Sequence, residues 1–476
     1  MVRSGYRKGR NVRRVLAAML AATLALAACG GDDDDGEAEE EPTDEPSDTT
    51  EAPAEDEELT ASDTGITEDT VKLGIPLVDY DAIAFAIDFN RGDQEAGYQT
   101  LIDWMNEEMD GIGGRQIEAV YQLYPPIPGM TPSALDVCTR LTDDEQVWAV
   151  VGVFIDFTGE GQLCVARDKN TIHIGHELEQ PWIDDAPPGL LLSPGSTADA
   201  SAANLITLMG EEGTLEGKTV AVLGDQDAEG RINDVIVPGL EEIGVETGST
   251  AVLNIVDEDT TQAQAQLDGF IERWETEGVD TIFFAGLRAS AKQFADKIRA
   301  AFPDATMVAD ASSILAQAQD EEAAGTTPNP YIPLFAMEGE TRSERWAAPN
   351  EFLQSCIDAY EERTGEPIVR PDDLKAGPDG KKVETHILVE DVCDELYMIK
   401  WLTEAAGTNP TRESFVEAVN SYGEMTLPTA NIGSLCEGKY TVNDSGRLME
   451  FDPELSENGD WNPLTEIADT SGGACA

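Results

Sequence analysis

The side chains that most often perform catalysis or bind metals are few and widely spaced in this sequence. Its three histidines are His173, His176 and His386, and none of them lies at a spacing used for a metal site. The sequence contains no Gly-x-Ser-x-Gly nucleophile motif and no Gly-x-x-x-x-Gly-Lys phosphate-binding segment. A segment beginning at Asp225 resembles a calcium loop, but Ile236 stands at the twelfth position, where a bidentate Glu is needed. We therefore expect a protein that is not an enzyme and that has no resident metal or cofactor.

The N-terminal segment has the pattern of an export signal. Basic residues precede an apolar run, which is shorter than the about 20 residues that a membrane-spanning helix needs. The run ends in Leu26-Ala27-Ala28-Cys29, and there it resembles the signals of bacterial lipoproteins. The resemblance implies that residues 1–28 are removed and that acyl chains on Cys29 hold the protein on the outer face of the cytoplasmic membrane. The alternative is an uncleaved or simply secreted leader with a chance cysteine.

The remaining cysteines suggest cross-links. An even number of cysteines in an exported protein indicates disulfides, and six cysteines allow fifteen pairings. Order along the chain and placement on predicted helices favour three of these pairs: Cys138–Cys164, Cys356–Cys393 and Cys436–Cys475.

The charge of the chain is strongly unbalanced. Asp and Glu number 94 against 30 Lys and Arg, which gives a formal net charge of −64. A surface of this sign repels phosphate backbones, so we expect no nucleic-acid partner. The same charge favours solubility and resists self-association, and we expect a monomer.

Beyond the signal, the chain divides into a polar stretch and a patterned body. Residues 29–65 contain no Lys or Arg, and we expect a disordered, extended tether because such a segment has little surface to bury. Strands are predicted at residues 71–78, 117–124, 147–154 and 171–175, and again at 219–224, 250–256, 281–286 and 306–310. Helices are predicted at residues 96–109, 132–142, 197–210, 232–243, 262–277 and 288–301.

Apolar strands that alternate with helices are typical of parallel sheets covered on both faces. The two series therefore predict an α/β protein with two similar lobes that separate near residues 193–195. After about residue 335, helical stretches and a strand-like tail follow, and we expect the chain to return to the first lobe, so that several connectors form a hinge. The predicted division is a signal at 1–28, a tether at 29–65, a first lobe at 66–193 and 335–428, and a second lobe at 194–334 and 429–476.

Four segments give a more specific resemblance. They are GITEDTVKLGI at 65–75, MDGIGGRQIE at 109–118, CTRLTDDEQVWAVVG at 138–152 and LEGKTVAVLG at 215–224. In content, order and spacing they resemble the type 1 periplasmic binding proteins of the leucine/isoleucine/valine-binding group, which serve branched-chain amino acid ABC transporters. The resemblance implies two Rossmann-like lobes in a Venus-flytrap arrangement, which close on a solute at the carboxyl ends of their strands.

The resemblance also places ligand contacts in the loops that follow particular strands. The matching positions are Asp156, Phe157, Thr158, Glu177, Leu178, Glu179, Glu229, Gly286, Leu287 and Asp310. Asp310 stands where the family has an acidic residue against a ligand ammonium. The rings of Tyr80 and Phe157 are expected to line the cleft, with ordinary packing as the alternative.

Several of these positions differ from the family pattern. Hydroxyl groups that would donate to a ligand carboxylate are replaced by acceptors, at Asp156, Glu177, Glu179 and Glu229. Ionised carboxylates cannot donate hydrogen bonds, so we expect a solute with more positive charge or more N–H donors, such as a polyamine, amidine or amide. In so acidic a chain, solvated loop carboxylates are the alternative.

Taken together, these features predict an extracytoplasmic solute receptor that delivers its ligand to ABC permease subunits in the membrane. ATP hydrolysis would belong to another subunit. Two alternatives are open: the same fold acting as a ligand sensor for a membrane signalling partner, and an extracytoplasmic enzyme.

Overall fold

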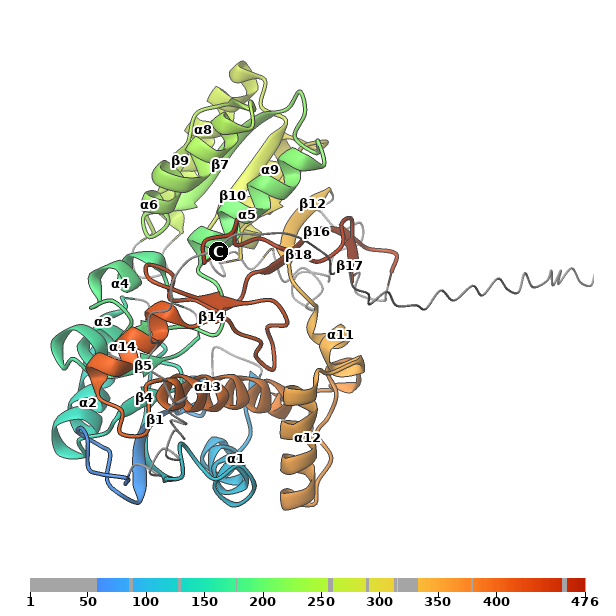
Figure 1. The fold of residues 1–476 in the computed structure, drawn as a ribbon. Helices are drawn as coiled ribbons and strands as arrows, with labels where there is room; N and C mark the ends of the chain where they lie inside the picture. The colour runs from blue at the N-terminus through green and yellow to red at the C-terminus, as the bar shows by residue number, and fades with distance from the viewer. Residues whose placement is uncertain are drawn as a thin grey trace, which may run out of the picture. The chain divides into compact units, whose positions relative to one another are not determined.

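Two mostly parallel sheets organise the chain (Figure 1). The structure is a computed structural model, and it describes residues 58–84, 89–126, 130–156, 158–176, 178–255, 260–287, 291–311, 315, 333–377, 380–455 and 460–475. Cys29, the signal and most of the expected tether lie outside these ranges. No helix in the described part of the chain is long and apolar enough to cross a membrane.

The first sheet has the strand order β3-β1-β4-β5-β6, and all of its pairs are parallel. Its strands are β1 (Thr70–Val78), β3 (Gln116–Tyr124), β4 (Ala149–Val151), β5 (Ile172–Ile174) and β6 (Leu191–Leu192). The helices of this part of the chain are α1 (Gln94–Glu108), α2 (Met130–Thr139), α3 (Glu160–Leu163) and α4 (Gln180–Asp185), with π-helical turns at Arg140–Asp144 and Cys164–Asp168.

The second sheet has the order β17-β16-β12-β11-β10-β7-β8, with β9 also paired to β7 and β18 to β16. Its strands are β7 (Thr219–Asp225), β8 (Glu246–Thr247), β9 (Ala251–Leu253), β10 (Thr281–Ala285), β11 (Thr306–Ala309), β12 (Leu334–Glu338), β16 (Ser445–Asp452), β17 (Asp460–Pro463) and β18 (Ala468–Asp469). Its helices are α5 (Ala198–Glu211), α6 (Glu229–Arg231), α7 (Val237–Glu242), α8 (Thr261–Glu277) and α9 (Ala291–Ala301), and a π-helical turn, Ile232–Ile236, joins α6 to α7.

Both faces of each sheet are buried, as the continuous apolar strands predict. In β7, Ala221 and Leu223 pack in one hydrophobic cluster with α8 and α9, whereas Val220 and Val222 pack in another with α5 and α7. The two strand series predicted from the sequence are confirmed, and so is the α/β fold.

The chain returns to the first sheet after β12. The returning helices are α11 (Arg342–Ala347), α12 (Glu351–Thr364), α13 (Thr385–Ala405) and α14 (Arg412–Ser421). Of the returning strands, β13 (Lys382–Val383) pairs with β2 (Phe89–Asn90), which precedes α1, and β14 (Gly423–Glu424) pairs with β15 (Ser434–Leu435). Trp148, which directly precedes β4, packs edge-on against Phe415 of α14 and donates to Thr403 of α13. Figure 1 shows α13 and α14 beside β1, β4 and β5 accordingly.

The strand pairing moves two of the expected lobe boundaries. β12, which begins at the predicted boundary, pairs with β11 and β16 and so belongs to the second sheet. Residues 429–442, expected in the second lobe, contribute Ala430, Leu435, Tyr440 and Val442 to the core of the first. The segments that pass between the sheets lie side by side, because Ser193 exchanges backbone hydrogen bonds with Tyr440 and Val442.

Three disulfides are present among the described residues, in the pairs that chain order favours. Cys138–Cys164 lies in the core on one face of the first sheet, Cys356–Cys393 joins α12 to α13, and Cys436–Cys475 ties down the C-terminal tail.

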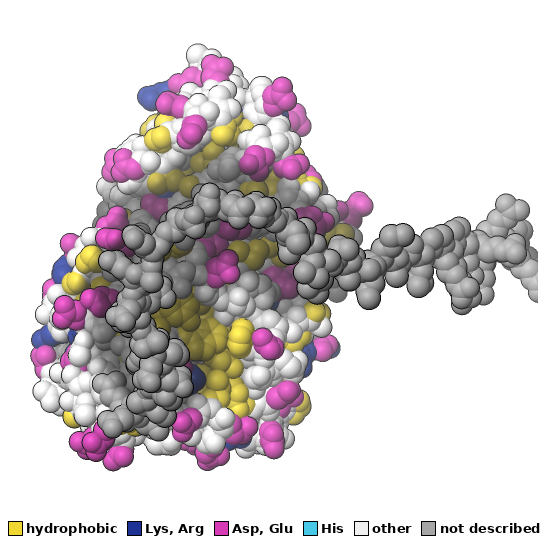
Figure 2. Space-filling model, viewed as in Figure 1, with side chains coloured by type: hydrophobic (Ala, Val, Ile, Leu, Met, Phe, Trp, Pro, Cys, Tyr) yellow, Lys and Arg dark blue, Asp and Glu magenta, His cyan; other side chains and the backbone are white. Residues whose placement is uncertain are grey.

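The expected tether is too long at its C-terminal end, because residues 58–65 belong to the folded body. The buried guanidinium of Arg115 donates to the carbonyls of Thr60, Thr67 and Thr408 and to the side chain of Asn409. An ion pair of 2.7 Å between Asp63 and Arg412 adds to this clamp, which sequence patterning alone does not reveal. Figure 2 shows Asp and Glu side chains scattered over the visible surface, in keeping with the large negative net charge.

Candidate functional site

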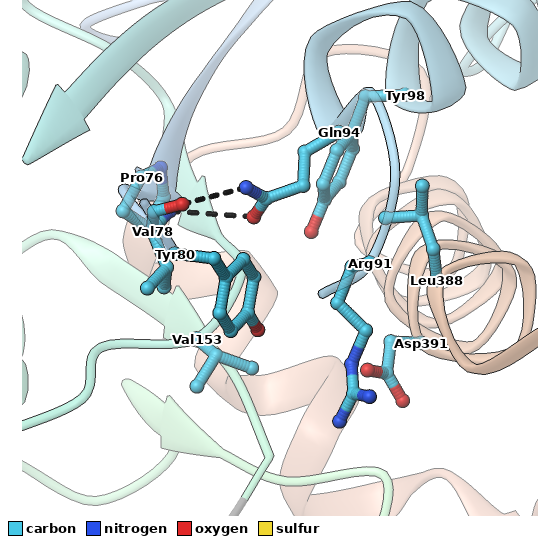
Figure 3. Close-up of a pocket in the computed structure, with 9 residues that line it drawn as sticks. All are labelled: Pro76, Val78, Tyr80, Arg91, Gln94, Tyr98, Val153, Leu388 and Asp391. Atoms are coloured by element: carbon cyan, nitrogen blue, oxygen red, sulfur yellow. Dashed lines mark hydrogen bonds between the residues drawn. The ribbon is translucent and has the colours of Figure 1, made fainter. Parts of the chain in front are cut away.

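A pocket opens at the carboxyl end of β1. Its lining residues come from the first sheet, the following loops, α1 and α13: Pro76, Val78, Tyr80, Arg91, Gln94, Tyr98, Val153, Leu388 and Asp391 (Figure 3). The cavity volume is about 30 Å³, which is room for one or two water molecules, so the wall is closely packed in this structure. Tyr80 is thus in the pocket wall, where the sequence places an aromatic contact, and it lies 6.0 Å from the ring of Phe89.

Hydrogen bonds fix two of the lining side chains. The amide of Gln94 donates to the carbonyl of Val78 at 2.7 Å and accepts from its N–H at 3.3 Å, as a neighbouring strand would (Figure 3). The hydroxyl of Tyr98 donates to Glu395 at 2.7 Å. The pocket wall is therefore held in place without a ligand.

Opposite charges stand at the pocket edge. Arg91 forms an ion pair with Glu384, and in Figure 3 its guanidinium also points toward Asp391. The imidazole Nε2 of His176, which follows β5, lies 3.8 Å from a carboxylate oxygen of Asp391. Burial raises the pKa of Asp391, and the charges of His176 and Arg91 act in the opposite direction. The pocket therefore offers donors and an acceptor side by side.

Two further carboxyl groups of α13 are fully buried next to this edge. Burial raises the pKa of Asp394 to about 7 and that of Glu395 to about 8. Hydrogen bonds from Thr429 to Asp394 and from Tyr98 to Glu395 offset only part of the cost of burying a charge. Both groups therefore hold protons at mildly acidic pH.

A third buried carboxylate of α13, Glu390, is held differently. It accepts from Arg342 at 2.9 Å, from Arg345 at 3.2 Å and from the indole of Trp346 at 2.8 Å. Burial raises its pKa, but the two arginines outweigh burial and lower the pKa overall. This contact attaches α11, which follows the crossing from the second sheet, to the helix that lines the pocket.

The loop after β4 folds back on itself at Asp156. Its carboxylate accepts from the Thr131 hydroxyl, from the backbone and hydroxyl of Thr158, and from the backbone of Gly161, at 2.7 to 3.2 Å. Asp156 is 2% exposed, so it organises the loop and does not face solvent. Phe157 lies outside the described residues.

The loop after β5 reaches the second lobe. Glu179 is the residue before α4, and its carboxylate accepts from Nη1 of Arg231 in α6 at 3.1 Å. The side chain of Arg231 is 5% exposed, and it also pairs with Asp199 of α5 at 3.5 Å and with Asp310, after β11, at 3.0 Å. Carboxyl-end loops of both sheets thus meet at one guanidinium. Leu178 is buried beside Glu179, and Glu177 lies outside the described residues.

The second-lobe loops are tied together by backbone donors. Gly286 and Leu287 both have a positive φ, which turns their N–H groups toward carboxylates. The N–H of Gly286 donates to Asp310 at 3.2 Å, and that of Leu287 donates to Asp225 at 2.9 Å. Glu229 is exposed on α6.

These contacts correct the sequence-based interpretation of the acidic residues. Asp156 is saturated by donors of its own loop, and Glu179 and Asp310 are both paired with Arg231. They therefore no longer give a reason to expect a cationic solute. Arg231 also takes the place against Asp310 that the resemblance assigns to a ligand ammonium.

Sequence reasoning missed Arg231, Arg91 and Asp391. Arg231 directly precedes the predicted helical stretch 232–243, and the sequence pattern does not tell which charged side chain turns inward. For Asp391 a signal exists: between residues 387 and 399 the sequence is apolar apart from carboxylates at 390, 391, 394 and 395, a spacing that places them along one face of a helix. Among the described residues, no group of three or more His, Cys, Asp and Glu side chains is arranged to hold a metal ion.

The comparisons with known proteins agree with this geometry. The family model described as "Periplasmic binding protein" matches residues 86–456, and the chain belongs to this family of extracytoplasmic solute-binding proteins. Its fold is that of the type 1 members, the Venus-flytrap arrangement. No curated protein matches the chain.

Solved structures of low sequence identity share the fold. A leucine-binding protein from Thermotoga maritima is 15% identical, with a TM-score of 0.56, over 84% of this chain and 99% of that one. An ABC transporter solute-binding protein from R. palustris, in complex with 4-hydroxybenzoate, is 13% identical, with a TM-score of 0.56, over 86% and 100%. A fatty acid ABC transporter substrate-binding protein from Thermomonospora curvata is 15% identical, with a TM-score of 0.55, over 86% and 95%.

Proposed function

We propose that this chain is the solute receptor of an ABC importer, held to the membrane through a lipid on Cys29. It captures a small amino-acid-like solute between its two lobes and presents it to permease subunits. It performs no catalysis itself. The observation that carries the proposal is the meeting of carboxyl-end loops from both sheets at Arg231 and Glu179, because ligands of open parallel sheets bind at these ends.

The pocket beside β1 supports the solute class. Arg91 offers N–H donors and Asp391 an acceptor in the same wall, which suits a solute that carries both an acidic and an N–H group and binds against this wall. The loop from His176 to Glu179 touches Asp391 at one end and Arg231 at the other. The backbone between these two residues spans at most about 10 Å, so the two contacts belong to one short loop at the carboxyl ends of the strands.

The test is to release small molecules from the purified protein by denaturation and to identify them by mass spectrometry. The solute found is then added back in a thermal unfolding assay. We expect the melting temperature to rise with the wild type and to rise less with Tyr80→Ala, whose side chain lines the pocket. A solute that is chemically converted during incubation, or an effect that is equal in both proteins, would contradict the proposal.

A further inference from the structure

We propose that Arg231 receives the carboxylate of the solute, and that Glu179 holds that position while no solute is bound. The inference rests on the proposed function and names the group that the second lobe recognises. In the solute-free protein, the Arg231–Glu179 contact would then also hold the two lobes together.

The partners of Arg231 differ in how readily they can be replaced. Asp310 is fully buried, accepts from the backbone of Gly286 and pairs with Nε at 3.0 Å. Asp199 belongs to the same lobe as Arg231 and lies in the first turn of α5. Glu179 alone of these three comes from the other lobe, and its side chain is the most exposed of them, at 26%. When the lobes separate, Glu179 is therefore the partner that leaves.

Charge explains why a carboxylate is the natural replacement. Three carboxylates already surround one guanidinium, so exchanging Glu179 for a solute carboxylate leaves the local charge unchanged. A solute ammonium directed at Nη1 would face a positive group and gain nothing there. Burial raises the pKa of Asp199, and the charge of Arg231 acts in the opposite direction.

The contact itself is built for exchange. Carboxylate and guanidinium match in shape and pair through charge-assisted hydrogen bonds, so any carboxylate that reaches Arg231 can reproduce what Glu179 does. A solute can displace Glu179 only if it binds Arg231 in the closed arrangement more tightly than Glu179 does. The strength of the Glu179–Arg231 contact thus sets the minimum affinity for Arg231 that a solute needs.

The experiment uses Glu179→Ala and needs no identified solute. Small-angle X-ray scattering of the solute-free protein should give a larger radius of gyration for Glu179→Ala than for the wild type. Sodium acetate, as the bare carboxylate of the missing side chain, should raise the melting temperature of Glu179→Ala by about 1–2 °C more than sodium chloride at equal ionic strength. The wild type, whose Arg231 is occupied, should not distinguish the two salts.

Two controls make the outcome decisive. Glu242→Ala removes an exposed carboxylate of α7 in the second lobe and should behave as the wild type. Glu179→Ala combined with Arg231→Lys should lose the preference for acetate, and Lys keeps a positive charge for the buried carboxylates. An unchanged radius of gyration, or no preference for acetate in Glu179→Ala, overturns the inference. Both results can be obtained even if the mass spectrometry finds no solute.

Discussion

The buried carboxyl of Glu395 makes the stability of the first lobe depend on pH. Its side chain is fully buried and accepts a hydrogen bond from Tyr98, and burial raises its pKa to about 8 from a usual value of 4.5. Between these two values the folded protein holds a proton that the unfolded chain releases. The contribution of Glu395 to the free energy of unfolding is therefore most favourable at acidic pH and falls as pH rises toward 8.

The magnitude follows from the size of the pKa shift. One pKa unit corresponds to about 1.4 kcal/mol, so Glu395 should cost about 2–3 kcal/mol of unfolding free energy between pH 5 and pH 7. Glu395→Gln keeps the shape and an acceptor for Tyr98, but it cannot ionise. We expect the variant to gain about 2–3 kcal/mol on the wild type over this interval.

The assay is urea denaturation followed by circular dichroism at pH 5, 6 and 7. Glu362→Gln, an exposed carboxylate on α12, provides the matched control and should parallel the wild type. The charges of His176, Asp391 and Asp394 act on the pKa of Glu395, so the variant is compared with the wild type at each pH. Parallel profiles for Glu395→Gln and the wild type would mean that Glu395 is ionised in the native protein, and the argument from burial would be wrong.

Two further predictions follow from the clamp and from the charge. Arg115→Met should lower the unfolding free energy by about 2–4 kcal/mol, because it removes four hydrogen bonds of a buried guanidinium, and limited proteolysis should cut residues 58–63 sooner. Unchanged stability and cleavage would exclude a clamping role. The net charge of −64 means that like charges repel one another in the folded protein, and salt screens this repulsion. Sodium chloride should therefore raise the melting temperature, by about 2–4 °C for each kcal/mol of repulsion that is screened. A melting temperature that falls with salt would show that specific ion pairs dominate.

The sequence predicts the fold well where a strand is long and apolar on both faces. β7 and β10 are of this kind, and their runs leave little choice but a buried parallel sheet. β6, with two residues, carries no pattern, and β12 ends in charged Glu338, so only its partners β11 and β16 define its sheet.

The candidate site was predictable as a place but not as a set of contacts. Loops at the strand ends were identified, and Tyr80 does line the pocket. Whether Asp156 and Glu179 face a ligand depends on donors distant in sequence, Thr131 and Arg231, that only the folded chain brings within reach. Residue type gives the charge of a loop, and the tertiary structure decides which partner neutralises it.

The contacts of Arg115 also determine where a membrane-anchored N-terminal segment would join the folded part of the chain. Residues 58–63 are fixed near the start of β1 and β3, whereas the pocket lies at the far end of β1, nine residues or about 30 Å away. If Cys29 carries the lipid that we propose, the N-terminal segment is attached to the first lobe at the end opposite the pocket. The stretch from Cys29 to residue 58 can reach about 100 Å when extended. This length is enough for the folded part of the protein to rotate and present its pocket to a membrane partner.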